Sequence, residues 1–418
     1  MAFAGGLGAA LANRGIVIFH DGLRPAVTEL IEGRMPRSQL APIAFSTCFG
    51  LILVFGIPFT LASTVILSHA LWLGTDIIGT WLPGPFEKNG AWKSRLGLLG
   101  SIALGALYGT MLVLGLQGFI LLNDRLPVNI HLSIGEIARP VIFTLAAYPA
   151  LTVAYQYGLK HGLVAFLLTL IIRQLASKLG LAHPDTWALL TGLALLMSHA
   201  IQEGRREPAP KDSFLIPLEQ VRRIRSHLPW IVVLGATYAL ASNLAVLMEG
   251  PQSLLALAHG DRLAAIHFTV ARAISFLPLR TMSALTTGVF LMDGLGFAPT
   301  LGLVAPYAAI AALAGGIVIT VEAISLVWIA GFFSRYPCYL KVVNNIRTAM
   351  TKLLEVASLV GGMVAANQMA PGLGFFAVAG LYLLNETAGS PVMRSAVGPV
   401  AVILVGITLN ILAFLHLM

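Results

Sequence analysis

Three acidic residues lie within long apolar runs of this chain, where ionisable groups are rarely found. Glu322 lies in GIVITVEAISLVWIAG, Glu355 lies in TKLLEVASLVGG, and Glu386 follows Asn385 in AGLYLLNETAGSP. A carboxylate at membrane depth costs about 2.5 to 3.5 kcal/mol, so such a residue usually faces a cavity, a partner or an ion path. Burial favours the neutral acid and a nearby arginine favours the carboxylate, so a group between these influences exchanges a proton near neutral pH. The chemistry that we predict is the binding of a coupling ion, H⁺ or Na⁺.

Arginines elsewhere in the chain offer each of these carboxylates a structural partner instead. The candidates for such an ion pair are Arg272, Arg280 and Arg347. We expect Arg347 to be either a carboxylate partner or a contact for an anionic solute, and Asn385 to be a solute ligand. Asn367 precedes a Pro-Gly turn, where its amide either binds a polar solute or caps a helix.

The segment HDGLRP is a dense polar cluster near the start of the chain. Asp21 suits a helix cap ahead of Pro25, and Arg24, Thr28 and Glu32 recur every four residues on one helical face. The segment is therefore either a solvated interfacial helix or a polar stripe packed against a transport domain. Asp21 and Arg24 join the candidate binding residues on the second interpretation.

No nucleotide- or metal-binding motif accompanies these residues. The chain has no GxxxxGK[ST] loop, no HExxH and no CxxC, and its histidines are scattered. We expect no metal, no cofactor and no enzymatic activity.

The amino-acid composition indicates that this protein is surrounded by lipid. The 418 residues are 57% hydrophobic and 11% charged, with a mean hydropathy of +0.85, whereas a soluble domain is about half apolar and about a quarter charged. The net charge of +8 comes from Lys and Arg between apolar runs, where the positive-inside rule puts them. A lipid bilayer is therefore the expected partner, and nucleic acid is not.

Apolar runs predict an all-α, polytopic membrane bundle of about ten or eleven segments. A span needs about 20 residues, so residues 1–12 form a partial or half-membrane helix unless the true start lies upstream. The run 41–73 is too long for one untilted span, and we expect a kink at Pro58. The segment 74–95 is turn-rich and is predicted to be a connection.

Two cation-rich stretches predict the orientation. The loop 203–227 carries six Lys or Arg residues and ends in an amphipathic surface helix, and residues 335–352 carry four, so both are expected in the cytoplasm. Three apolar segments lie between them although an even number of crossings is required, so 263–295 is predicted to be broken or re-entrant. We take 1–418 as one transport domain, with the 203–227 loop between two halves.

One internal echo raises the question of a repeat. DGLRPAVTELIE at 21–32 resembles NNIRTAMTKLLE at 344–355, and inverted repeats are common in secondary transporters. Among roughly 10⁵ window pairs several such matches arise by chance, so the echo alone does not decide the question.

Several short motifs with polar residues resemble one known family. They are FHDGLRP and LIEG near the start, TDIIG at 75–79, and, in the last third, RYP, NIRTAM, LEVA, LNE and GPV. Over nearly the whole chain they resemble the YhfT family of bacterial inner-membrane proteins, although the family pattern has a fuller first membrane helix. The resemblance implies a transport-related protein of the inner membrane, with an amino-acid-like or amine solute.

We therefore predict a secondary active transporter or permease for a small polar solute, which is amino-acid-like, an amine, or a phosphorylated or phosphonate compound. Coupling to H⁺ or Na⁺ is expected, and a homodimer is compatible with the sequence. One alternative is the membrane subunit of a multi-component system that docks a coupling protein on 203–227. Another is a membrane-embedded enzyme, for which no catalytic set is visible.

Overall fold

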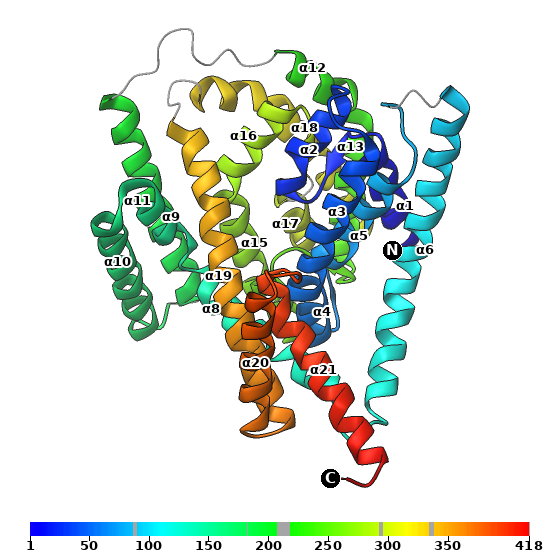
Figure 1. The fold of residues 1–418 in the computed structure, drawn as a ribbon. Coiled ribbons are helices and arrows are strands. Elements are labelled where there is room, and N and C mark those ends of the chain that lie inside the picture. The colour runs from blue at the N-terminus through cyan, green and yellow to red at the C-terminus, as the bar shows by residue number, and fades with distance from the viewer. Residues whose placement is uncertain (87–89, 182, 207–217, 292–295, 334–337, 418) are drawn as a thin grey trace.

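A computed structural model describes residues 1–86, 90–181, 183–206, 218–291, 296–333 and 338–417. Within these ranges the protein is almost entirely helical, with four strands of two residues each (Figure 1). The predicted all-α membrane class is therefore confirmed. Lys211 and Arg335, which contribute to the two predicted cationic loops, lie outside the described residues.

Among the residues that the structure describes, six helices are long and apolar enough to cross a membrane, or seven if one bent pair counts as a span. The six cover Arg37–Ser63, Gly90–Asn123, Leu159–Lys178, Ala308–Leu326, Lys341–Met369 and Arg394–Phe414. Three further apolar helices, at Ala2–Asn13, Leu228–Asn243 and Leu373–Thr387, have fewer than the roughly 20 residues of a full span. The ten or eleven predicted segments thus include both full-length and shorter helices.

The first half of the chain contains the helices α1 to α11 and the strands β1 and β2. In order they are α1 (Ala2–Asn13), β1 (Val17–Ile18), the 3₁₀ turn η1 (Asp21–Leu23), α2 (Arg24–Ile31), α3 (Arg37–Leu51), the π-helical turn η2 (Ile52–Gly56), α4 (Ile57–Ser63), β2 (Ile66–Leu67), α5 (Ser68–Trp81), α6 (Gly90–Asn123), α7 (Ile130–Gly135), α8 (Ala138–Leu145), α9 (Tyr148–Tyr157), α10 (Leu159–Lys178) and α11 (Pro184–Arg206).

The second half of the chain continues from α12 to α21. It contains α12 (Leu218–Ser226), α13 (Leu228–Asn243), β3 (Leu247–Met248), α14 (Pro251–Ala258), α15 (Arg262–Ser275), α16 (Leu277–Thr287), β4 (Phe290–Leu291), α17 (Phe297–Val304), α18 (Ala308–Phe333), α19 (Cys338–Met369), α20 (Leu373–Thr387) and α21 (Arg394–Phe414).

Helices α1 to α6 and helices α13 to α18 form two copies of one unit. In each copy a short helix precedes a strand and packs on the last two helices of the unit, α1 on α5 and α6, and α13 on α17 and α18. In each copy an irregular span leads into the second strand: α3–α4 contains the π turn η2, and α15–α16 is bent. Strand β1 pairs in parallel with β4, and β2 pairs in parallel with β3, so each strand is completed by the other copy.

Matching hydrogen bonds support this correspondence. The side-chain amide of Asn13, which ends α1, donates to the carbonyl of Gly79 at 3.1 Å, and that of Asn243, which ends α13, donates to Gly302 at 2.9 Å. Each amide makes a second bond to a carbonyl three residues further on. The same polar side chain therefore ties the same two helices together in both copies.

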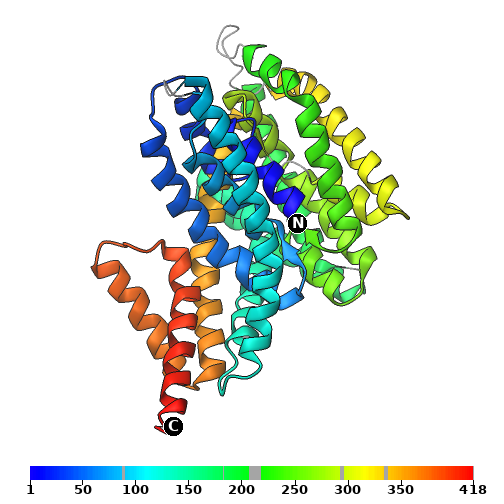
Figure 2. The same cartoon turned by 90° about the vertical axis from the view of Figure 1, so that its right-hand side faces the viewer.

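The two copies run in opposite directions. In Figure 1, α3 leads down to α4 whereas α15 leads up to α16, and Figure 2 shows the molecule turned by 90°. The repeat is therefore inverted. It does not coincide with the echo between 21–32 and 344–355, because the first segment is η1 and α2 whereas the second lies inside α19.

Three predicted boundaries need correction. The run 41–73 is divided at residues 64–67, where Thr64 follows α4 with φ 60°, in addition to the π turn that distorts the helix directly before Pro58. The predicted connection 74–95 is helical up to Trp81, because α5 continues into it. Residues 338–352, predicted as a cytoplasmic loop, belong to the continuous helix α19.

The predicted break in 263–295 is present. Helices α15 and α16 meet at a bend of 53°, and Pro278 lies in the first turn of α16. The amphipathic helix predicted at the end of the 203–227 loop is α12, whose Glu219, Arg222 and Arg225 are exposed.

Candidate functional site

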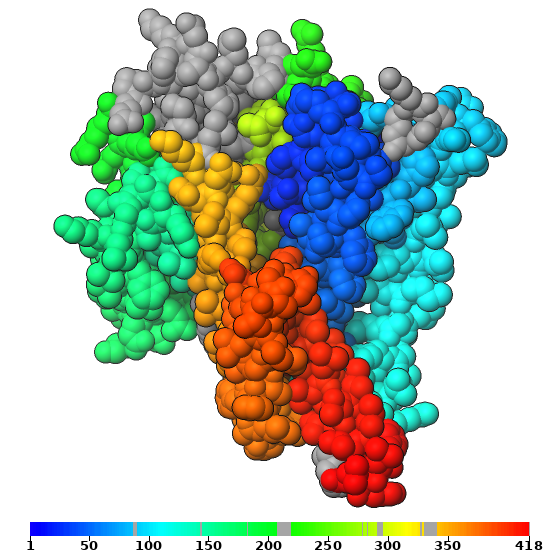
Figure 3. Space-filling view, in the orientation of Figure 1, coloured from blue at the N-terminus to red at the C-terminus, as the bar shows by residue number. Residues whose placement is uncertain are grey.

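A cavity of about 340 Å³ lies where the two copies meet α19 and α21. Its wall combines the end of β1, the irregular spans α3–α4 and α15–α16, and the middle of α19. Figure 3 shows the surface hollowed between α19 and the N-terminal helices. The residues that line it with polar or charged groups are His20, Asp21, Thr47, His69, Arg272, Arg347, Thr351 and Ser395.

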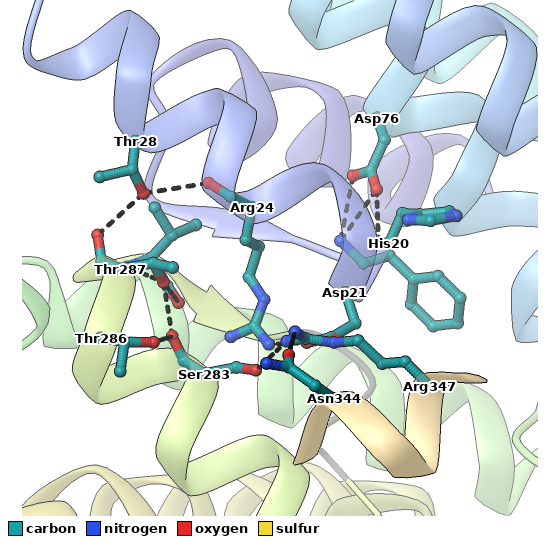
Figure 4. Close-up of polar contacts among 12 residues, drawn as sticks. His20, Asp21, Arg24, Thr28, Asp76, Ser283, Thr286, Thr287, Asn344 and Arg347 are labelled. Atoms are coloured by element: carbon teal, nitrogen blue, oxygen red, sulfur yellow. Dashed lines mark hydrogen bonds and ion pairs between the residues drawn. The ribbon is translucent and has the colours of Figure 1, made fainter. Parts of the chain in front are cut away.

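One wall of the cavity carries an ion-pair network around Asp21 (Figure 4). The carboxylate of Asp21 accepts hydrogen bonds from Arg24, in the next turn of chain, and from Arg347 of α19. Arg347 also donates to Ser283 of α16 at 2.6 Å and to Asn344 at 2.9 Å. Arg24 is fully buried, so Asp21 supplies the counter-charge that its burial requires. The network joins both copies of the repeat to α19.

Asp76 of α5 fixes the backbone that presents Asp21. Its fully buried carboxylate accepts from the backbone N–H of Phe19 at 2.9 Å and of His20 at 2.8 Å. Strand β1 ends at Ile18, and buried N–H groups beyond the end of a strand need another acceptor. The side chain of Asp76 therefore replaces a neighbouring strand.

The opposite wall carries a second ion pair. Arg272 of α15 donates to Glu249 at 3.1 Å, and Glu249 is only 1% exposed. The guanidinium of Arg272 also lies 4.7 Å from the ring centroid of Phe276, a cation–π arrangement. Arg272 lies in the last turn of α15 and Phe276 lies between α15 and α16, so this part of the wall is next to the bend.

Aromatic rings form the remaining contacts around His69 of α5. Its ring lies 4.8 Å from that of Phe19 and 5.0 Å from that of Phe55, measured between centroids. The cavity thus combines two arginines and one aspartate with an aromatic surface. Such a lining suits a small solute that carries both a charged group and an apolar part.

The sequence candidates separate into three places. Asp21 and Arg347 line the cavity, and Arg24 is buried behind Asp21. Glu322 lies apart, 3.6 Å from Arg280 in another cavity, so the expected arginine partner is present for this carboxylate. Glu355 instead pairs with Lys352 at 2.9 Å.

The last three candidates lie along α19, α20 and the turn into α21. Glu386 pairs with Arg394 at 2.8 Å. Asn385 closes the turn between α20 and α21 through two bonds to the backbone of Val392, each 3.0 Å long. Asn367 accepts from the backbone N–H of Gly372 at 2.7 Å, which is the capping role. The amides of both asparagines therefore have structural partners.

Sequence reasoning did not select Asp76, Glu249, His69 and Ser283 as site residues. Asp76 was placed in a connection because of the LPGP turn that follows it. Its signal was a lone carboxylate in the apolar stretch LWLGTDIIGTW. Glu249 stands similarly alone in VLMEGP, directly before the Gly-Pro that opens α14.

Comparison with known proteins places the chain in a family. Residues 1–418 match the sequence profile of the YhfT family, which is described as a protein of unknown function. The uncharacterized protein YhfT of Escherichia coli (strain K12) is 32% identical over 431 residues, covering 99% of this chain and 96% of that protein. No solved structure matches. The chain therefore belongs to the YhfT family, as its motifs had indicated.

Proposed function

We propose that this protein is a secondary active transporter for a small polar solute, coupled to H⁺ or Na⁺. The observation that carries the proposal is the inverted repeat, in which the span α3–α4, distorted by the π turn η2, and the bent pair α15–α16 both contribute to the lining of one cavity. Secondary transporters bind their solutes at the interface of such repeats, next to discontinuous helices. Rocking of one copy against the other would then expose the cavity to each side of the membrane in turn.

The charges of the cavity indicate the chemistry of the solute. The cavity lining contains two arginines, Arg272 and Arg347, and one carboxylate, that of Asp21, so an anionic group on the solute is favoured. Arginine binds carboxylate and phosphate groups in a bidentate manner, and Asp21 suits an amine. An amino acid or a phosphorylated or phosphonate amine therefore fits best.

The distribution of cations supports an orientation in the bacterial inner membrane. Helix α12 and the N-terminal end of α19 lie toward the same end of the molecule, the upper end in Figure 1. Helix α12 exposes Arg222 and Arg225 there. The positive-inside rule assigns this end to the cytoplasm.

Solute screening of the purified protein tests the proposal. Amino acids, amines and phosphonates are added with and without Na⁺ and at several pH values, and the unfolding temperature is measured. A solute at 100 times its Kd adds about 2.7 kcal/mol to the free energy of unfolding. Stabilisation should be lost in Arg347→Lys and kept in Arg34→Lys, whose guanidinium binds surface glutamates.

Uptake of the solute into proteoliposomes then separates transport from binding. We expect accumulation only under a H⁺ or Na⁺ gradient. A solute that binds in the cavity but is never accumulated, with either gradient, would contradict the proposed transport.

A further inference from the structure

The inverted repeat builds the same secondary cavity twice. One cavity, of about 430 Å³, lies between α4 and α6, and the other, of about 370 Å³, lies between α16 and α18. Gly56 lies eight residues before the left-handed Thr64, and Arg280 lies eight residues before the left-handed Gly288. Gly56 and Arg280 therefore occupy the same place in the two cavities.

A second pair of positions matches in the same way. Gly105 packs against Gly5 of α1, and Gly315 packs against Gly235 of α13. Leu112 and Glu322 each follow those α6 and α18 glycines by seven residues, and both line their cavity. Where the first cavity has glycine and leucine, the second therefore has arginine and glutamate.

This difference shows that the fold does not require the ion pair. The first cavity is built without a charged lining residue, so packing alone accounts for its shape. Ionisable groups at membrane depth are costly and are usually kept for function. The Arg280–Glu322 pair is therefore a feature added to one copy only.

In the Arg280–Glu322 pair, each side chain keeps a polar atom that makes no hydrogen bond to the described residues. Arg280 Nη2 and Glu322 Oε2 are 3.6 Å apart, beyond hydrogen-bond distance. Arg280 is 6% exposed. Among the described residues, Arg280 Nη1 and Glu322 Oε1 are buried without a hydrogen-bond partner. A buried carboxylate with an unused oxygen can accept a proton, whereas the adjacent guanidinium repels Na⁺.

We propose that Glu322 is the proton-binding carboxylate of this carrier, with Arg280 as its counter-ion; this inference rests on the proposed transport function. A proton from water binds a carboxylate oxygen of Glu322 and gives a neutral acid, which releases Arg280 from the ion pair. Loss of the proton to the opposite side restores the pair, and the guanidinium stays charged throughout.

Helix α16 connects this site to the solute cavity. Arg280 and Ser283 lie one turn apart on α16, and Ser283 accepts the hydrogen bond of Arg347. Arg280 also follows the bend between α15 and α16. A change in the Arg280–Glu322 pair would therefore shift α16 relative to Arg347. Proton binding at Glu322 would in this way affect the solute cavity.

No further charged side chain lines this cavity among its described residues. Helices α13 and α17, which pack on α18, contain no charged residue. Helix α12 also packs on α18, but its Glu219, Arg222 and Arg225 are exposed, and Arg223 donates to the carbonyl of Gly15. Arg280 is thus the group that governs protonation of Glu322.

Infrared difference spectroscopy of the full-length protein in nanodiscs tests the site directly. Between about pH 5 and about pH 9 the carbonyl stretch of a protonated carboxyl group should appear and disappear. We expect Glu322→Gln to lose this band and the matched variant Glu355→Gln to keep it. A band that persists unchanged in Glu322→Gln would overturn the proposal.

A double variant tests whether loss of the band is caused by misfolding. Arg280→Gly combined with Glu322→Leu reproduces the lining of the first cavity, so it should fold with an unchanged unfolding temperature while losing the band. In proteoliposomes the same double variant should lose accumulation driven by a pH gradient and keep solute exchange. Accumulation that survives would overturn the proton site and leave transport standing, whereas a titrating band without any solute uptake would overturn transport and leave the proton site standing.

Discussion

Asp21 and Arg347 form an ion pair although 326 residues separate them in the chain. Asp21 belongs to the first copy of the repeat, and Arg347 belongs to α19, which follows the second copy. Through Ser283 the same guanidinium also contacts α16 of the second copy. The side chains of Asp21 and Arg347 therefore link three separate parts of the bundle, namely the first copy, the second copy and α19.

Removing the charge of Asp21 should destabilise the protein strongly. In Asp21→Asn the buried Arg24 loses its acceptor carboxylate, and breaking a buried ion pair costs about 3 kcal/mol or more. The free energy of unfolding can be measured by denaturant titration in mild detergent. Asp21→Asn combined with Arg24→Met should regain most of the loss, because the buried guanidinium of Arg24 is then removed as well.

The control for this variant is Glu29→Gln in the same helix. Glu29 is exposed, and hydrogen bonds from Arg34 hold the pKa of its carboxyl below the usual range. Solvent screens such a surface pair, so we expect no measurable change. Equal losses in Asp21→Asn and Glu29→Gln would contradict the structural role assigned to Asp21.

Asp76→Ala should also reduce stability, for a different reason. The substitution leaves two buried backbone N–H groups, of Phe19 and His20, without an acceptor, and each such group costs about 1 to 3 kcal/mol. Hydrogen exchange at Phe19 and His20 should accelerate before the rest of the bundle opens. Asp124→Ala, at an exposed carboxylate, serves as the control, and an equal effect there would refute this role.

Glycine contacts test the inverted repeat itself. Gly5 and Gly235 occupy equivalent positions where two helix backbones touch, so leucine at either site should cost about 1 to 3 kcal/mol by overpacking. Gly118 in α6 faces open space, and leucine there should be tolerated. Unfolding of each variant is followed by tryptophan fluorescence. A variant at Gly235 that behaves like the one at Gly118 would argue against equivalent packing in the two copies.

The sequence predicted much of the polar chemistry but not its grouping. Asp21 and Arg24 were proposed from the polar segment HDGLRP and Arg347 as a carboxylate partner or anion contact, and the three side chains do form one network beside the cavity. An arginine partner for Glu322 was likewise expected. Tertiary contacts decide which charged residues become partners, and these contacts cannot be inferred from spacing along the chain. The sequence alone therefore did not pair Asp21 with Arg347.

The repeat was hidden because the two copies share backbone geometry more than side chains. Asn13 and Asn243 each precede a strand by the same interval, yet two matching residues are too few to rise above chance. The linings of the two secondary cavities also differ, as Gly56 and Arg280 illustrate. Similarity was instead visible between 21–32 and 344–355, which are not equivalent in space.

The crossed pairing of the four strands has an evolutionary consequence. Because β1 is completed by β4 and β2 by β3, one copy alone leaves two strand edges open, and a second copy in the opposite orientation closes them. An ancestral half-size chain would thus have needed to insert into the membrane in both orientations and to dimerise. Fusion of two such copies into one chain would fix each orientation, and the two cavities would then be able to diverge, one charged and the other apolar.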